Sequence, residues 1–299
     1  ESEVIALLQK VFATTDSSIR VGIGDDAAVV MTSPESVLTS DMAVQDVHFK
    51  LEWSSAFDIG RKITAANIAD VLSMGARCQY LTAAVTLTGD ESLQWIENLA
   101  QGMKHEAGLA GAHIVGGDIA RGMHIVISMS AIGHTAKPIL RKGATVGDDI
   151  FISSLTGWSA AGLALLSGEI SISSRAADKA LSEFSAPTLD YESDYSGATS
   201  MADVSDCILI QAGQIAIASG VAMKFDPELC KSSQEFSELS ALAEEVKVDV
   251  FEWIFAGGED HVLLATGRNL PGVKIGSVSS GSGVLGIDKK MAPVSWSHF

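Results

Sequence analysis

Residues 66–76 read Ala-Asn-Ile-Ala-Asp-Val-Leu-Ser-Met-Gly-Ala, and they close a stretch in which apolar residues recur at helical spacing. This spacing predicts a buried helix over residues 54–74, with Gly75 as its C-terminal stop. On such a helix Asn67 and Asp70 lie on one face. Asp70 is therefore expected to point toward the same space as an aspartate at the end of a neighbouring strand.

Short acidic motifs recur at predicted turns, in the company of glycine and apolar residues. They are Gly24-Asp25-Asp26-Ala27-Ala28, Ser40-Asp41, Gly116-Gly117-Asp118, Asp203-Val204-Ser205-Asp206 and Gly257-Gly258-Glu259-Asp260. Partly buried like charges repel each other and lose hydration, so a fold that gathers them usually holds cations between them. Oxygen ligands without clustered histidine or thiolate suit magnesium, and magnesium usually accompanies a phosphate substrate. The motifs therefore predict phosphoryl transfer.

Composition limits the classes of function. The 299 residues are 47% hydrophobic, which is enough for one large domain or two ordinary ones. The formal net charge of −17 argues against a nucleic-acid partner, because no basic stripe offsets the repulsion. Apolar runs are too short for a membrane span and no secretion signal is seen, so we expect a cytoplasmic protein. The cysteines, Cys78, Cys207 and Cys230, are expected to be buried free thiols.

Strand and helix patterns alternate along both halves of the chain. Helices are expected at residues 4–12, 54–74, 92–107, 157–166, 171–184, 206–219 and 237–246. Strands are expected at residues 28–31, 37–39, 80–88, 114–115, 125–132, 149–153, 221–225, 261–266 and 273–278. Residues 134–147 resemble a crossing between halves. We therefore predict an α/β or α+β protein with two domains, 1–137 and 138–299.

The order and spacing of these motifs resemble those of the thiamine-monophosphate kinase family, within the aminoimidazole-ribonucleotide-synthetase-like superfamily. The matching stretches are residues 22–28, 40–41, 47–49, 66–76, 116–118, 121–122, 141–144, 147–148, 157, 160–163, 203–206 and 257–260. Each stretch is a weak signal alone, but the whole set covers nearly the entire chain and is specific.

The resemblance implies an ATP-dependent kinase that converts thiamine phosphate into thiamine diphosphate. It implies a homodimer whose N-terminal domains pair into a β-barrel, followed by a C-terminal α/β domain. Magnesium would be held by residues matching Asp25, Asp26, Asp41, Asp70, Asp118 and Asp206, with Ser40 and Ser205 as auxiliary oxygens. Whether potassium is also required stays open.

A phosphate acceptor is already an anion near neutral pH, so the chemistry needs no strong base. We expect direct in-line transfer, with charge stabilisation by metal ions and arginine. Asp118, Arg141 and Asp206 are the expected catalytic residues. Arg121 and Arg141 are candidates for phosphate contacts because a guanidinium matches phosphate oxygens, although a linker arginine is often merely a surface residue.

The remaining candidates bind nucleotide or substrate. Gly117, Asp118, Arg121, Arg141 and Ser205 are expected at the nucleotide, although a tight turn alone would explain Gly117. Asp46, His48, Phe49 and Glu259 are expected at thiamine phosphate, and Trp296 and Phe299 are expected either to stack on its rings or to fill a core. Asp203 is a candidate helix cap, and Glu259 and Asp260 have an alternative role in their turn.

The chain departs from the family pattern at a few positions. Cys207 replaces glycine, Gln211 and Gln214 replace aspartate and histidine, and Trp158 replaces aspartate. A cysteine for glycine would be costly if that position needs a positive φ. These changes keep open a regulator that binds metal and nucleotide without catalysis.

Other enzymes of the superfamily are rivals, among them aminoimidazole-ribonucleotide synthetase. Selenophosphate synthetase would need a reactive cysteine in an N-terminal glycine-rich loop, whereas the first cysteine here is Cys78. The hydrogenase-maturation dehydratase would need a C-terminal cysteine tail, which Ser297-His298-Phe299 does not supply.

Overall fold

A computed structural model describes residues 2–21, 23, 28–32 and 36–287. The chain divides into two compact units, and each is treated by itself. Unit 1 comprises Glu1–Leu72 and Ala76–Lys137, and unit 2 comprises Ser73–Gly75 and Pro138–Phe299.

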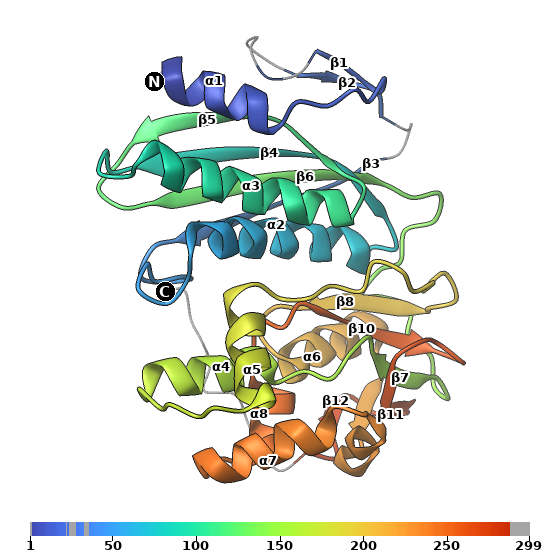
Figure 1. The fold of residues 1–299 in the computed structure, drawn as a ribbon. Coiled ribbons are helices and arrows are strands. Elements are labelled where there is room, and N and C mark those ends of the chain that lie inside the picture. Colours follow the sequence, from blue (N-terminus) through green and yellow to red (C-terminus); the bar gives the residue numbers. More distant parts are fainter. Residues whose placement is uncertain (1, 22, 24–27, 33–35, 288–299) are drawn as a thin grey trace. The chain divides into compact units, whose positions relative to one another are not determined.

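Unit 1 is built on a four-stranded sheet in the order β3-β6-β4-β5 (Figure 1). The strands are β3 (Ser36–Val44), β6 (Val126–His134), β4 (Arg77–Leu87) and β5 (His113–Arg121). β3, β6 and β4 pair antiparallel, whereas β4 and β5 pair parallel through the crossover helix α3 (Leu93–Leu109). β3 and β5 are therefore the two edges of the sheet.

The helices of unit 1 leave the two faces of this sheet in different environments. α2 (Ala56–Ser73) and α3 lie across one face, as Figure 1 shows. Residues of β6 alternate between buried and half-buried positions, as expected when one face is covered. On the other face of β3, Leu38 is 71% exposed and Met42 is 54% exposed. Unit 1 also contains α1 (Ser2–Val11) and the short pair β1 (Ile19–Val21) and β2 (Val29–Val30).

Unit 2 is built on a six-stranded sheet in the order β12-β9-β11-β7-β10-β8. Its strands are β7 (Asp149–Ile152), β8 (Ser200–Val204), β9 (Ala222–Phe225), β10 (Val262–Gly267), β11 (Val273–Ser279) and β12 (Gly283–Leu285). Only β12 and β9 pair parallel among these neighbours in the described part of the chain. The helices are α4 (Trp158–Ser167), α5 (Arg175–Ser185), α6 (Ile208–Ser219), α7 (Phe236–Val246) and α8 (Val250–Ala256), with a 3₁₀ helix at Pro227–Ser232.

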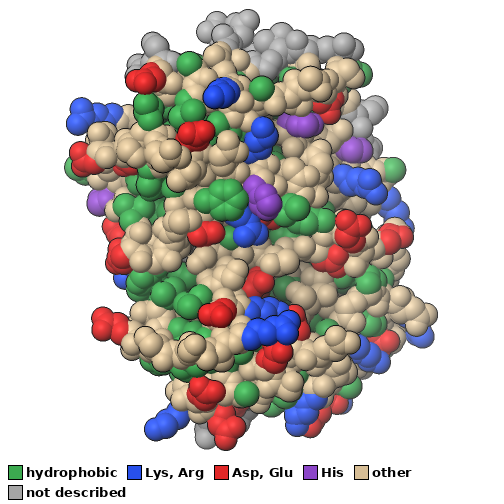
Figure 2. Space-filling model, viewed as in Figure 1, with side chains coloured by type: hydrophobic (Ala, Val, Ile, Leu, Met, Phe, Trp, Pro, Cys, Tyr) green, Lys and Arg blue, Asp and Glu red, His purple; other side chains and the backbone are tan. Residues whose placement is uncertain are grey.

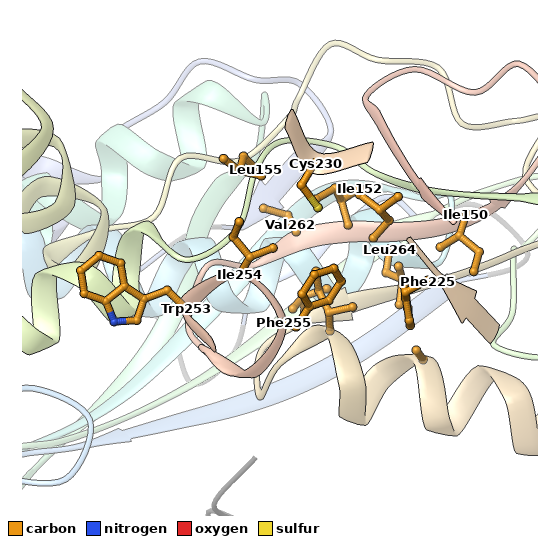
Figure 3. Packing of buried hydrophobic residues seen from close by; sticks show 14 of the residues in the cluster. Ile150, Ile152, Leu155, Phe225, Cys230, Trp253, Ile254, Phe255, Val262 and Leu264 are labelled. Carbon is orange, nitrogen blue, oxygen red and sulfur yellow. The ribbon is translucent and has the colours of Figure 1, made fainter. Parts of the chain in front are cut away.

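The core of unit 2 forms around β10. Every residue of β10 and of β8 is buried, which is why β10 has an almost continuous apolar sequence. Figure 3 shows Val262 and Leu264 of β10 among side chains of β7, β9 and α8, including the ring pair of Phe225 and Phe255, whose centroids lie 5.5 Å apart.

The predicted mixed α/β class is confirmed, but several elements differ from the prediction. β8 and α8 were not predicted, and β5 runs through residues 116–118, which were expected to form a turn. The helix expected from residue 171 begins at Arg175, because the Ser174 side chain accepts the Ala177 N–H at 3.2 Å and caps it.

The state of the cysteines is the one predicted from the sequence. Cys78, Cys207 and Cys230 are free and buried, and burial raises the pKa of the Cys78 and Cys230 thiols to about 12. Figure 2 shows acidic and basic side chains interspersed over the visible face. No helix in the described part of the chain is long and apolar enough to cross a membrane.

Candidate active site

Two aspartates of unit 1, Asp41 on β3 and Asp70 on α2, lie where side chains of α2 contact β3. The Thr39 hydroxyl donates to Asp70 Oδ2 at 2.5 Å, and the Asp41 amide donates to Asn67 Oδ1 at 3.2 Å. Asn67 is fully buried and its Nδ2 donates to the Ile63 carbonyl at 2.9 Å, so its side chain is fixed. The prediction that Asn67 and Asp70 share a helix face directed at an aspartate-bearing strand is confirmed.

The chemistry of this pair suits a hard divalent cation. Asp41 and Asp70 are half-buried, and the Thr39 hydroxyl and the Asn67 side-chain amide are among the groups that contact these two residues. Magnesium prefers such oxygen ligands and keeps several waters. No group of three or more His, Cys, Asp or Glu side chains suited to a metal occurs among the described residues. Asp25 and Asp26, which were expected to complete the set, lie outside them.

The strand register separates Asp118 from this pair. Asp41, Met129, Ala83 and Gly117 form one row across the sheet, on the face that α2 covers. Asp118 follows Gly117 and therefore faces the other side. Asp41 and Asp118 also lie on opposite edges of the sheet, three strand spacings or about 14 Å apart. One copy of unit 1 therefore does not bring them around the same ion.

Gly117 is explained by strand packing. A Cβ at this position would lie 2.0 Å from the Ala83 carbonyl oxygen, so no larger residue fits beside β4. This contact replaces the predicted explanation by a turn. Ser40 lies on the same face as Asp118, and its hydroxyl donates to the Met129 carbonyl at 2.9 Å and accepts from Ser130 Oγ at 3.2 Å.

The loop after β3 carries the residues expected at the substrate. The Val44 N–H donates to His48 Nδ1 at 3.1 Å, which leaves the proton of a neutral imidazole on Nε2. Asp46 is exposed, has a φ of +64°, and donates its N–H to the Phe49 carbonyl at 2.7 Å. The Phe49 ring is 4% exposed, so it anchors the loop in the core.

Arg121 ends β5 and is exposed. Its Nε donates to the Thr88 carbonyl at 3.3 Å, and its guanidinium lies against Gly89. The side chain is thus partly engaged by the adjoining turn.

In unit 2, Ser205 and Asp206 link β8 to α6. Asp206 is exposed, whereas Cys207 is fully buried as the N-cap residue of α6. Cys207 has a φ of −178°, which is extended backbone open to any residue. The cysteine therefore introduces no backbone strain here, contrary to the concern raised by its replacement of glycine.

Residues 257–261 run alongside this link. The Glu259 N–H donates to the Ser205 carbonyl at 2.7 Å, and the His261 N–H donates to the Val204 carbonyl at 3.0 Å. Gly258 packs so closely that a Cβ would lie 2.2 Å from the Asp206 carbonyl oxygen.

Asp260 acts inside the fold. It is 6% exposed and accepts the N–H groups of Gly157 and Ser159 at 2.8 and 3.0 Å, at the start of α4. Burial raises its pKa to about 7, against the lowering effect of these hydrogen bonds. The alternative that Asp260 serves structure is the one that the contacts favour.

Arg141 and Asp206 lie toward opposite ends of α6. Ser219, the last residue of α6, donates its hydroxyl to the Arg141 carbonyl at 3.2 Å. The helix has 12 residues, so its ends are about 18 Å apart. The exposed Arg141 thus has its backbone at the end of α6 opposite Asp206, and this contact fixes its carbonyl but not its guanidinium.

Comparison with known proteins decides the family. Residues 24–135 match the model of the AIR synthase related protein, N-terminal domain. Thiamine-monophosphate kinase from Mycobacterium tuberculosis (strain H37Rv) is 36% identical, with 83% of this chain and 75% of the relative covered. Thiamine-monophosphate kinase from Aquifex aeolicus (strain VF5) is 30% identical, with 100% and 98% covered. The chain belongs to the thiamine-monophosphate kinase family.

A solved structure supports the same family assignment. AaThiL complexed with AMPPCP and TMP matches with a TM-score of 0.81 and 28% identity, covering 100% of this chain and 97% of that one. The kinase family pattern and the observed fold thus agree over both units.

Three of the four positions that differ from the usual thiamine-monophosphate kinase pattern, Trp158, Cys207 and Gln211, are buried. Trp158 is 2% exposed, its Nε1 donates to Glu235 Oε2 at 3.2 Å, and the Lys179 ammonium lies 4.4 Å from its ring centroid. Gln211 is 2% exposed, and its Nε2 donates to Ser205 Oγ at 3.4 Å. Gln214 is exposed on α6. Trp296 and Phe299 lie outside the described residues.

Sequence reasoning missed two features of this kinase fold. Thr39 was not singled out, although its place two residues before Asp41 on the same strand face was a usable signal. Asp203 was expected to cap a helix, but it lies within β8 and its Oδ2 contacts His261 Nδ1 at 2.9 Å. No sequence spacing indicates that contact, because 58 residues separate the partners.

Proposed function

We propose that this chain transfers the γ-phosphoryl group of ATP to thiamine phosphate and forms thiamine diphosphate. The observation that carries the proposal is the similarity over its full length to AaThiL, whose solved complex contains AMPPCP and TMP. The relatives from Mycobacterium tuberculosis and Aquifex aeolicus, both named thiamine-monophosphate kinase, support the same activity.

Magnesium ions would be held by Asp41 and Asp70 in unit 1 and by Asp206 in unit 2, together with Asp25, Asp26 and Asp118. When bound, magnesium neutralises phosphate charge and stabilises the charge that spreads over the transferring group. Charge neutralisation is especially important here, because a chain of net charge −17 otherwise repels ATP and the phosphate group of thiamine phosphate.

The protein's own groups position the reactants. The attacking phosphate oxygen is already ionised, so no side chain has to remove a proton from it. His48, with its proton on Nε2, is a suitable donor to an acceptor on thiamine phosphate. Asp46 and Glu259 are assigned to the same substrate, and Phe49 holds the loop that carries His48.

The remaining polar groups are assigned to the nucleotide. We assign Arg121 and Arg141 to phosphate or ribose contacts, and Ser205 to an auxiliary oxygen beside Asp206. Because the Arg141 backbone lies at the end of α6 opposite Asp206, we assign Arg141 to the nucleotide rather than to the metal at Asp206.

We propose a homodimer because Asp41 and Asp118 are both assigned to magnesium. Asp41 and Asp118 occupy opposite faces and opposite edges of one sheet, so they share an ion only if two copies contribute. Independently of a shared ion, the exposed Leu38 and Met42 give β3 an apolar patch on the open face of the sheet, which pairing of two copies would cover.

The activity is tested by incubating the full chain with magnesium, thiamine phosphate and ATP labelled at the γ-phosphate. The proposal expects label in thiamine diphosphate in a single step, with equal amounts of ADP formed. ATP binding without any thiamine diphosphate would contradict it and would favour the regulator.

The shared site is tested by mixing subunits. Asp41→Asn and Asp118→Asn should each be inactive alone, whereas a statistical mixture of both, dissociated and reassociated, should regain about a quarter of wild-type activity. Half of its dimers are mixed, and each mixed dimer keeps one intact site out of two. A mixture as inactive as its components would contradict the shared site.

A further inference from the structure

A seam of backbone hydrogen bonds joins residues 203–206 to residues 257–261. β8 and β10 pair in register up to Val262 and Val204. Beyond that pair, the N–H of His261 bonds to Val204 and the N–H of Glu259 bonds to Ser205, so the two segments stay together after the regular ladder ends. The residues assigned to metal and substrate, Asp206 and Glu259, are thus carried by the two sides of one seam.

A buried polar pair spans the seam. Asp203 Oδ2 and His261 Nδ1 are 2.9 Å apart, and the two side chains are only 4% and 6% exposed. A hydrogen bond to a carboxylate is strong in a low-dielectric interior, and a buried carboxylate that loses its donor becomes costly. Asp203 lies two residues before Ser205, and His261 lies two residues after Glu259. The pair therefore lies two residues from the half-buried Ser205 and Glu259 and three residues from the exposed Asp206.

The backbone of the second segment is strained. Glu259 has a φ of +66° and His261 has a φ of +51°, in the left-handed region that residues other than glycine rarely adopt. Such conformations persist where the surrounding contacts over-determine them, and they cluster at functional sites. The contact of His261 with Asp203 is one of the contacts that hold this segment.

Movement of this segment would reach Asp206. Gly258 lies so close to the Asp206 carbonyl oxygen that the two segments have little room to slide. Gln211 binds Ser205 Oγ from α6, and its own Oε1 is a buried acceptor with no donor among the described residues.

We propose that Asp203 and His261 form a positioning pair that fixes Ser205 and Asp206 for the binding of magnesium and nucleotide, and Glu259 for the binding of thiamine phosphate. This inference rests on the proposed function, since it assumes that Ser205, Asp206 and Glu259 bind magnesium, nucleotide and thiamine phosphate. Neither Asp203 nor His261 touches a reacting atom. A purely structural pair would instead stabilise unit 2 without changing ligand binding.

The test measures AMPPCP binding by calorimetry at increasing magnesium, without thiamine phosphate. The variants are Asp203→Asn, His261→Asn and the double variant; asparagine at 261 tolerates a positive φ, so it removes the imidazole without adding backbone strain. Each single variant should raise the magnesium concentration for half-saturation about tenfold, the effect of one lost charge-assisted hydrogen bond. The double variant should show little further change, because both substitutions break the same contact.

A matched control is Glu106→Gln in unit 1. Glu106 is fully buried and contacts Arg61 Nε at 2.9 Å, so this change also breaks a buried carboxylate contact. It should lower the melting temperature while leaving the magnesium dependence unchanged. If Asp203→Asn and His261→Asn behave like Glu106→Gln, the positioning role is wrong. If Asp203→Asn does not fold, the magnesium dependence of AMPPCP binding in His261→Asn alone decides the test.

Failure of the proposed function gives a different result. A wild-type chain that binds AMPPCP with magnesium but makes no thiamine diphosphate would contradict the kinase activity. The shift in magnesium half-saturation in the two single variants would still support the positioning pair.

Discussion

The carboxylates of unit 1 and those of unit 2 belong to similar short motifs, but their surroundings differ. Asp41 and Asp70 are half-buried beside the neutral Asn67 and Thr39. Asp203 and Asp260 are more than nine-tenths buried, and each faces strong donors, an imidazole in one case and two helix N–H groups in the other. Asp206, three residues after Asp203, is exposed. Exposure and the type of hydrogen-bond partner, more than the sequence motif, therefore distinguish a candidate metal ligand from an aspartate that stabilises the fold.

The largest effect should follow removal of a unit 1 ligand. Asp70→Asn keeps an oxygen for the Thr39 hydroxyl but loses the charge that magnesium needs, so thiamine diphosphate formation should fall by about 100-fold or more. The control is Asp58→Asn on the same helix, where the carboxylate accepts only from Ser55 at 2.6 Å in the interactions seen. Initial rates at saturating ATP measure both. A normal rate for Asp70→Asn would remove Asp70 from the metal site.

A scaffolding carboxylate should instead affect stability. Asp260→Ala leaves the N–H groups of Gly157 and Ser159 without their acceptor at the start of α4, so the free energy of unfolding should fall by about 2 kcal/mol. Urea unfolding followed by tryptophan fluorescence measures this. The magnesium dependence of the folded variant should match wild type, and a selective rise in magnesium demand would contradict the division between the two classes.

The same residue should give a pH signature. The pKa of Asp260 is about 7 in the folded chain and about 3.9 when unfolded, so the folded state binds more protons between these values. Its contribution to stability is therefore present below pH 4 and is lost as the pH rises through 7. Between pH 5 and pH 7 the loss should be about 2 kcal/mol in wild type. This loss of stability should be absent in Asp260→Asn. If the free energy of unfolding changed equally with pH in both proteins, Asp260 would be ionised in the folded state.

A smaller effect should follow loss of the hydroxyl that orients Asp70. Thr39→Val removes the donor at 2.5 Å and keeps the shape, so the magnesium concentration for half-maximal rate should rise about fivefold. Thr64→Val is the matched control, because Thr64 bonds only the Gly60 carbonyl within α2 in the contacts seen, at 2.8 Å. Equal effects of the two substitutions would show that the Thr39 contact has no special role.

Local sequence rules predicted much of this molecule. Helical spacing placed α2 and aimed Asp70 at β3, because a helix face depends only on neighbouring residues. The same rules placed a turn at Gly117, where the real cause is the carbonyl of Ala83 on the adjacent strand. Strand pairing is a tertiary property, and it also decided which face Asp118 occupies.

Long-range contacts account for the rest. Asp203 was expected to cap a helix, yet its partner His261 lies 58 residues away. Asp260 caps α4 from about a hundred residues away, and Cys207 fits because its φ is extended. The roles of Asp25, Asp26, Trp296 and Phe299 and the cytoplasmic location stay predictions.

The most direct measurement compares the magnesium dependence of thiamine diphosphate formation in Asp206→Asn and Asp260→Asn, two substitutions that each neutralise one unit 2 aspartate. We predict that Asp206→Asn loses about 100-fold or more in rate, or needs far more magnesium, while it remains as stable as wild type. We predict that Asp260→Asn is altered in stability and keeps the wild-type magnesium dependence. The account would be contradicted if Asp206→Asn had normal magnesium dependence and rate, or if both variants shifted equally.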